Sequence, residues 1–181
     1  MVQKKKVQGS VSIPEGVEVS IENGLFKAKG VKGEVSKRLS YPGICIEKKE
    51  GKIALSTDEQ SKKGKRIINT FKAHMNNLFI GVTSGFMYTL KICSGHFPMT
   101  VKVDGDRLVI TNFLGEKKPR VSRIVAGTSV VVKGDIITVE AIDIEAAGQT
   151  AANIEKTTKI KGRDRHVFQD GCYVIEKPKW K

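Results

Sequence analysis

The stretch VEVSIENGLFKA, residues 17–28, alternates apolar and polar positions on both sides of an Asn-Gly pair. Val17, Val19 and Ile21 fall on one face of a first strand, and Phe26 falls on one face of a second. Such alternation is typical of half-buried strands, and Asn-Gly is a strong signal for a two-residue hairpin turn. The stretch therefore predicts an antiparallel hairpin that buries one face.

A second hairpin and one helix are expected after this hairpin. The segment ICIEKKEGKIALS, residues 44–56, alternates, turns near Gly51 and alternates again. From residue 61 the apolar positions follow helical spacing instead, and Gly81 is placed where it would end the helix. The first part of the chain thus predicts strands followed by a single amphipathic helix.

The same order of signals recurs at an offset of 82 residues. Residues 17–21 overlie 99–103, and Gly33-Glu34 overlies Gly115-Glu116. A second hairpin is predicted over residues 130–140 and a helix over 144–156. The fold class is therefore α+β, with two tandem homologous domains, 1–82 and 83–181, each a small antiparallel sheet covered by one helix. A chance alignment of these signals is the alternative, which their shared order weakens.

The charge of the chain favours a polyanionic partner. Lys and Arg number 32 against 19 Asp and Glu, which gives a net charge of +13. Cations in such excess can neutralise phosphates, so we expect nucleic acid as the partner class. A role of the charge in solubility alone is the less favoured explanation. No helix sets a basic face against an apolar one, and no apolar run is long enough to cross a bilayer, so no membrane partner is expected. The opening residues lack a signal peptide, and we expect a soluble intracellular protein.

Motifs that carry catalytic chemistry are missing from the sequence. The phosphate-binding, dinucleotide-binding, zinc-protease and serine-hydrolase patterns do not occur. Cys45, Cys93 and Cys172 are odd in number and far apart, so we interpret them as buried free thiols. The acidic pairs Asp58-Glu59 and Asp143-Glu145 lie at expected helix starts. We expect no enzyme, no cofactor and no metal, although an active site assembled only by folding stays open as an alternative.

Four basic clusters concentrate the positive charge. The first, Lys4–Lys6, fits a frayed chain end. The second crowds the start of the first expected helix: Lys62, Lys63, Lys65 and Arg66. The third occupies an expected loop: Lys117, Lys118, Arg120 and Arg123. The fourth is the tail: Lys159, Lys161, Gly162, Arg163, Arg165, Lys177, Lys179, Trp180 and Lys181. We expect the last two clusters to bind RNA and the second to form a further basic surface.

The tail contains both cations and aromatic residues. A linker would lack the aromatic residues, and a core strand would lack the cations. Arg163 and Arg165 alternate as in a strand and suit phosphate oxygens. Phe168 and Tyr173 are interpreted as core residues, whereas Trp180 fits either packing or stacking on a base. Signature motifs of base-reading modules are missing from the sequence. Structured RNA recognised by shape and backbone fits better than sequence reading on DNA.

Three segments resemble the large-subunit ribosomal protein six family in its archaeal and eukaryotic form. They are IPEGVEVSIENGLFKAKGVKGEVSKRL (residues 13–39), NNLFIGVTSGF (76–86) and RHVFQDGCYV (165–174). The first is similar to the family's first-domain signature, the second to the join between its domains, and the third to its closing signature. Bacterial members carry Tyr-Lys-Gly-Lys-Gly near their end, where this chain has KIKGRDR (159–165) and lacks the Tyr, so a bacterial source is not expected. Within the archaeal and eukaryotic form, the resemblance favours an archaeal source.

The resemblance implies a structural protein of the large ribosomal subunit, located in the cytoplasm within the ribosome. It implies binding to large-subunit ribosomal RNA, mostly through the second domain, beside the sarcin-ricin loop and the site where translation factors dock. Neighbouring ribosomal proteins and translational GTPases are then the expected protein partners. A free-standing RNA chaperone, or another RNA-binding protein outside the ribosome, is the alternative that charge alone permits.

Overall fold

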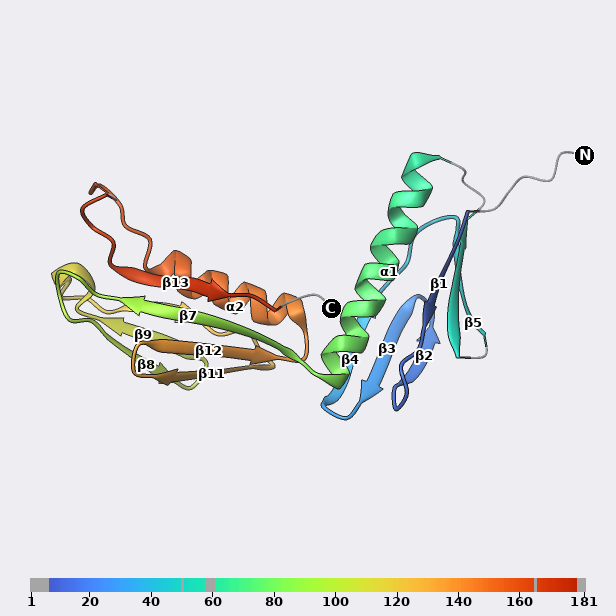
Figure 1. Cartoon of the computed structure of the whole chain (residues 1–181), viewed down its shortest axis with the longest axis horizontal. Coiled ribbons are helices and arrows are strands. Elements are labelled where there is room, and N and C mark those ends of the chain that lie inside the picture. The colour runs from blue at the N-terminus through green and yellow to red at the C-terminus, as the bar shows by residue number, and fades with distance from the viewer. Residues whose placement is uncertain (1–6, 50, 58–60, 165, 179–181) are drawn as a thin grey trace, which may run out of the picture. The chain divides into compact units, whose positions relative to one another are not determined.

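The computed structural model describes residues 7–49, 51–57, 61–164 and 166–178. The chain divides into two compact units, Met1–Ser84 and Gly85–Lys181, and each contains antiparallel strands and one long helix (Figure 1). The α+β class and the tandem arrangement are thus confirmed. The division lies between Ser84 and Gly85, rather than between residues 82 and 83, because the first helix runs further than expected.

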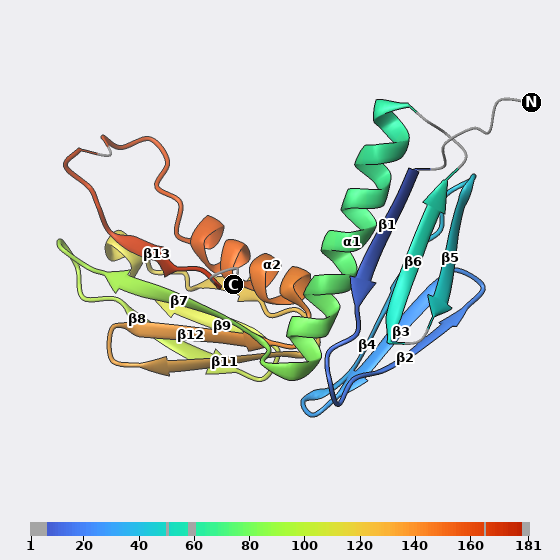
Figure 2. The same ribbon diagram turned by 45° about the vertical axis from the view of Figure 1, so that its right-hand side comes forward.

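The first unit contains two three-stranded sheets and helix α1, Lys62–Thr83. One sheet has the order β1 (Val7–Ser12), β6 (Lys52–Thr57), β5 (Ile44–Lys49), and the other β2 (Glu18–Glu22), β3 (Leu25–Gly30), β4 (Gly33–Arg38). Figure 2 shows α1 running along β1. The helix buries its apolar face, including Phe71, Met75 and Phe79, and the Phe79 ring lies 6.1 Å from that of Phe26. Each unit therefore holds two sheets where we expected one.

The predicted turn between β2 and β3 is confirmed. Asn23 and Gly24 have φ of 47° and 77°. Two successive positive φ values are the requirement of the hairpin turn that Asn-Gly favours. Asn23 and Gly24 therefore form the turn because both residues tolerate a positive φ, which is the property on which the prediction was based.

Close contact between the β3–β4 turn and the end of α1 requires a glycine at position 30. A Cβ there would lie 2.8 Å from the Val82 carbonyl oxygen, closer than real contacts allow. That same oxygen accepts a hydrogen bond from the Lys32 amide at 3.0 Å. The turn thus satisfies one of the carbonyls that a helix end leaves unpaired.

The expectation that Gly81 ends α1 is wrong. Gly81 is buried inside the helix, which continues to Thr83 with Ser84 as its C-cap. Gly85, with φ of 74°, is the residue that takes the left-handed conformation after the cap. Sequence spacing alone did not distinguish the two glycines.

The second unit repeats the first and adds one strand. Its sheets have the orders β11-β12-β7-β13 and β10-β9-β8. The bounds are β7 Phe86–Cys93, β8 Thr100–Asp104, β9 Arg107–Thr111, η1 Phe113–Gly115, β10 Arg120–Arg123, β11 Thr128–Lys133, β12 Ile136–Ala141, α2 Ile144–Thr157 and β13 Gly171–Glu176. The orders β7-β12-β11 and β8-β9-β10 correspond to β1-β6-β5 and β2-β3-β4. Strand β13 pairs with β7 along the edge that faces away from β12 (Figure 1). In the first unit, the corresponding edge of β1 pairs with none of the described strands.

The core of the second unit lies beneath α2. Ala147, Ala151 and Ile154 are buried on one face of this helix, as the sequence predicts, and they pack among strand residues such as Leu90 and Ile137. Asp143 caps the helix by accepting a hydrogen bond from the Glu145 amide at 3.0 Å. The segment that joins α2 to β13 is therefore anchored at both ends, because it begins at the end of α2 and ends at a strand that pairs with β7.

Candidate RNA interface

The connection between β9 and β10 carries Lys117 and Lys118 on an exposed bend. Before the bend, Asn112 and Leu114 both have left-handed backbones, with φ of 59° and 50°. Non-glycine residues rarely adopt this conformation. The Asn112 side chain is fixed by donating from Nδ2 to the Pro98 carbonyl at 2.9 Å. The two lysines therefore follow a turn with a defined backbone.

Arg120 and Arg123 lie on a strand, so the expectation that all four cations occupy a loop is wrong for these two. They begin and end β10, which pairs with β9 over its whole length. In this register Arg123 lies directly opposite Arg107, and both are exposed. Like charges placed opposite each other destabilise a sheet unless an anion compensates them. Arg107, whose other neighbour in the sheet is Asp104, was not among the expected site residues.

Arg120 is engaged inside the protein. Its Nε and Nη2 donate to the two carboxylate oxygens of Glu116 at 2.8 and 2.6 Å. Its Nη1 donates to the carbonyl oxygens of Thr157 and Lys159 at 2.8 and 3.3 Å, and the guanidinium lies 4.2 Å from the Phe113 ring centre. Arg120 thus joins the connection to the end of α2 and holds the start of the tail.

The pKa of Glu116 is lowered by groups of both the connection and the tail. The hydrogen bond from Arg120 lowers this pKa the most, and partial burial opposes it. The charges of Arg120 and Arg163 lower it further. The field of Arg163, a tail residue, therefore reaches a carboxylate of the connection.

Three of the tail cations lie on an irregular segment between α2 and β13. Lys159, Lys161 and Arg163 are exposed, and Gly162 has φ of 68°. The expectation that Arg163 alternates as in a strand is wrong, because the strand begins only at Gly171. The Arg163 guanidinium lies 4.8 Å from the centre of the Phe168 ring instead.

A clasp of His96 and Asp170 fixes the far end of this segment. The buried Asp170 carboxylate accepts from the Gly95 and His96 amides at 2.7 and 3.0 Å, and its Oδ2 lies 2.6 Å from His96 Nδ1. Burial raises the pKa of Asp170, but the hydrogen bonds from His96 and Gly95 outweigh it, so the pKa is lowered overall. The His96 ring stacks on Phe168 with centres 4.6 Å apart.

Phe168 and Tyr173 are not core residues, which corrects that expectation. Phe168 is half-buried between polar neighbours, and Tyr173 is 40% exposed on the outer face of β13. The interpretation of the cysteines is also wrong in part. Cys45 is exposed and Cys93 half-buried, whereas burial raises the pKa of the Cys172 thiol to about 12.

The cluster at the start of α1 belongs to the first unit. Lys62, Lys65 and Arg66 are exposed, and Lys63 lies 5.7 Å from the Tyr41 ring centre. Ser61 caps the helix by accepting from the Gly64 amide, and its first turn has no acidic residue. Cations at this end oppose the helix dipole.

Some expected site residues lie outside the described part of the chain: Lys4–Lys6, Arg165, Lys179, Trp180 and Lys181, as do Asp58 and Glu59. Lys177 is described and exposed. Among the residues that the structure describes, no group of His, Cys, Asp and Glu side chains could hold a metal ion. None of the described helices is long and apolar enough to span a bilayer.

Comparison with known proteins matches the chain along most of its length. The family model described as ribosomal protein L6 matches twice, over residues 13–85 and 97–171, which supports the duplication. The large ribosomal subunit protein uL6 of Methanobrevibacter smithii is 50% identical over 98% of this chain and 99% of its own length. Those of Methanosarcina mazei and Archaeoglobus fulgidus are 49% and 46% identical, over 96% and 93% of this chain and 98% and 88% of their own lengths.

These matches agree with the geometry described above. Each family match covers most of one of the two repeated sheet-and-helix arrangements, without β1 in the first and without β7 in the second, and the relatives extend over the tail as well. The resemblance inferred from the three sequence segments is therefore confirmed. The chain belongs to the ribosomal protein L6 family.

Proposed function

We propose that this protein is a structural constituent of the large ribosomal subunit that binds large-subunit ribosomal RNA through its second unit. The relatives that cover nearly the whole chain are named as large ribosomal subunit proteins, which supports a cytoplasmic location in the ribosome. The family is one of structural ribosomal proteins, so the chain is not an enzyme.

One observation carries the RNA-binding part of the proposal. Seven of the expected site cations in the second unit are exposed and form no salt bridge within the described residues: Lys117, Lys118, Arg123, Lys159, Lys161, Arg163 and Lys177. If these cations were paired with acidic residues of the protein itself, the surface of the tail would be neutral. Unpaired cations instead gain free energy by displacing the counterions of phosphates.

Arg120 has a different role in this proposal from the one expected. Its donors are committed to Glu116 and to two carbonyls, so it braces the interface instead of facing RNA. The brace brings the Lys117-Lys118 bend to the segment that carries Lys159 and Lys161. Two cationic segments far apart in sequence can then contact one folded RNA surface.

We further propose that this RNA surface lies near the sarcin-ricin loop and the translation-factor site. The family resemblance supports this placement, with neighbouring ribosomal proteins and translational GTPases as partners. A hydroxyl-radical footprint on large-subunit RNA tests it. Protection confined to RNA helices away from that loop would contradict the placement.

A charge-matched pair of variants tests the interface. Lys117, Lys159 and Lys161 are changed together to Ala in one variant, and the exposed first-unit residues Lys29, Lys32 and Lys52 in the other. The first variant should bind large-subunit RNA more weakly, and its dependence of log affinity on log salt should flatten by roughly one unit for each phosphate that is no longer neutralised. The second removes the same net charge and should keep the wild-type slope.

Three outcomes would contradict the proposal. Equal salt slopes in both variants would show that net charge, and not this surface, drives binding. Failure of the wild-type protein to sediment with large subunits after a moderate salt wash would remove the ribosomal assignment. Equal affinity for an unrelated RNA duplex would favour the free-standing RNA chaperone instead.

A further inference from the structure

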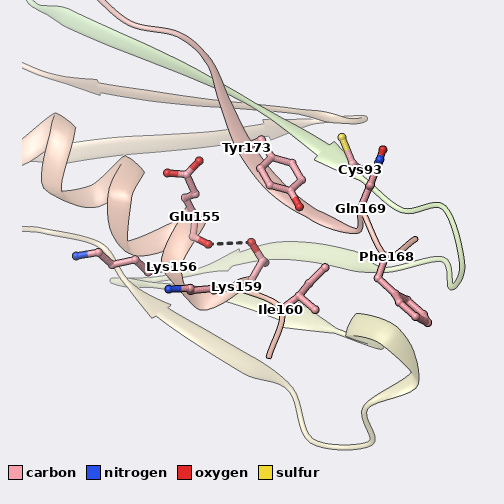
Figure 3. Close-up of a pocket in the computed structure, with 9 residues that line it drawn as sticks. Cys93, Glu155, Lys156, Lys159, Ile160, Phe168, Gln169 and Tyr173 are labelled. Atoms are coloured by element: carbon pink, nitrogen blue, oxygen red, sulfur yellow. Dashed lines mark hydrogen bonds between the residues drawn. The ribbon is translucent and has the colours of Figure 1, made fainter. Parts of the chain in front are cut away.

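A pocket of about 640 Å³ opens beside the tail segment of the second unit. Figure 3 shows its lining residues, which come from the ends of β7 and α2, from the segment after α2 and from β13. Ile160, Phe168, Cys93 and the ring of Tyr173 provide apolar and aromatic surface. Pockets of roughly 300 to 1,000 Å³ with such linings hold small organic groups.

The Tyr173 ring is held in place on one wall. Its hydroxyl donates to the Asp170 carbonyl at 3.2 Å, and Asp170 is itself fixed by the clasp with His96. The ring lies against the strand at Gly171, where a Cβ would come within 3.2 Å of Tyr173 Cζ. An immobilised aromatic ring loses little conformational entropy when a planar group stacks on it.

Two of the residues that line the pocket are cations. The exposed Lys156 and Lys159 are lining residues, and Lys161 and Arg163 follow on the same segment. Glu155 is the acidic residue among those that line it. The opening is therefore suited to a negatively charged ligand, while the interior is suited to an apolar, planar one.

We propose that this pocket receives one unstacked base of the RNA that the tail binds. The proposal rests on the RNA-binding function proposed above and adds a site to it. The base would stack on the Tyr173 ring, its phosphates would face Lys156 and Lys159, and the side-chain oxygen of the exposed Gln169, whose Nε2 donates to the His166 carbonyl at 3.4 Å, offers a hydrogen-bond acceptor. Stacking of a base on an aromatic side chain is favourable for every base, and single-stranded RNA is commonly bound in this way.

A planar base with its phosphate fits this combination better than a peptide does. A peptide side chain that fills an apolar pocket brings no negative charge to meet the rim lysines unless it carries an acid. A nucleotide supplies the planar ring and the anion together. An extrahelical nucleotide also costs least to insert, because it is already unpaired.

Chemical probing of bases in assembled large subunits tests this site. Particles carry the wild-type protein, Tyr173→Ala, or the control Val131→Ala, which removes an exposed side chain from β11 of the same sheet. Tyr173→Ala should raise the reactivity of one nucleotide, or two adjacent ones, about tenfold while the protein stays on the particle. Val131→Ala should leave the profile unchanged.

Protein occupancy, measured by gel on the same particles, separates the two proposals. Wild-type protein that is missing from particles contradicts the ribosomal function itself. An unchanged reactivity profile at full Tyr173→Ala occupancy overturns the base pocket and leaves that function standing.

A second measurement needs no variant and covers the case in which Tyr173→Ala does not fold. Ultraviolet cross-linking of wild-type particles should place a nucleotide on Cys93, Phe168 or Tyr173. Nucleotides attached elsewhere on this protein but never on the pocket residues would overturn the proposal. Alkylation of Cys93 reports whether the pocket is occupied. If a peptide of a neighbouring protein protects Cys93 from alkylation, the pocket binds a protein partner, and the proposal of a base pocket is overturned.

Discussion

Arg120 and Glu116 form a two-point ion pair, with Nε and Nη2 of the guanidinium bound to opposite oxygens of the carboxylate at 2.8 and 2.6 Å. The third nitrogen of Arg120 reaches the carbonyl of Thr157, 37 residues away in sequence. The fixed fork of a guanidinium makes this geometry possible, and a lysine ammonium cannot reproduce it. The pair therefore ties the basic connection to the end of α2.

Arg120→Lys should destabilise the second unit while keeping the charge. The variant lacks the two-point pair and the hydrogen bonds to the last carbonyls of α2, and a cost of about 1 to 2 kcal/mol is expected for a partly exposed pair. Urea unfolding measures this cost. Arg123→Lys, an exposed change at the other end of β10, should cost almost nothing. Equal costs for the two variants would show that the fork does not brace the unit.

Asp170→Asn should remove an acid-dependent part of the stability. Because the folded pKa of Asp170 is below its ordinary value of 3.8, the unfolded chain binds more protons there as pH falls. The stabilisation is fully present above that value and is lost as pH falls through the lower, folded pKa. Unfolding free energies of the variant should therefore change less than those of the wild type below about pH 4.

The control for this prediction is Glu155→Gln, a change at an exposed carboxyl near the end of α2. Its pH profile should follow the wild type. Parallel profiles of Asp170→Asn and the wild type down to about pH 2 would mean that the clasp does not control acid stability.

Local signals explain which parts of the fold could be predicted. Asn23-Gly24 needs only its own φ values to turn the chain, and the apolar face of α2 repeats every three to four residues. The strands that escaped prediction depend on distant partners. In β13, Gly171 pairs with Cys93, and in β10 four residues, RVSR, pair with β9. The four residues of β10 are too few to show an alternating apolar pattern, and the strand-forming residues of β13 do not show by themselves that they pair with β7.

In the candidate interface, too, local features could be predicted from the sequence and contacts between distant residues could not. Exposure of Lys117, Lys159 and Lys161 was predictable, because a lysine rarely lies fully buried. The engagement of Arg120 was not, since its partners include carbonyls 37 and 39 residues away. His96 and Asp170 are 74 residues apart, so the sequence showed only a scattered histidine.

Gly30→Ala should destabilise the first unit by about 2 kcal/mol or more. The added Cβ would meet the Val82 carbonyl, a backbone atom that cannot rotate aside, and would push the β3–β4 turn away from the end of α1. Thermal unfolding measures the loss. Gly95→Ala is the matched control, because nothing lies within 4 Å of a Cβ there. A wild-type melting temperature for Gly30→Ala would contradict the close approach.

Phe168→Ala should cost about 1 to 2 kcal/mol, less than the loss of a fully buried ring, because Phe168 is only half-buried. The variant removes the stacked contact with His96 and the contact with the Arg163 guanidinium. The neighbouring Val167→Ala, at a residue 59% exposed, should cost almost nothing. Urea unfolding of both variants measures the difference.

The same two variants show whether the ring also orders the tail cations. If Phe168 positions Arg163, then Phe168→Ala should weaken binding to large-subunit RNA at fixed salt, whereas Val167→Ala should not. The salt slope should fall together with the affinity, because an Arg163 that is no longer held against the ring contacts its phosphate less often. A loss of stability without any change in RNA affinity would limit Phe168 to holding the fold and would detach the clasp from the interface.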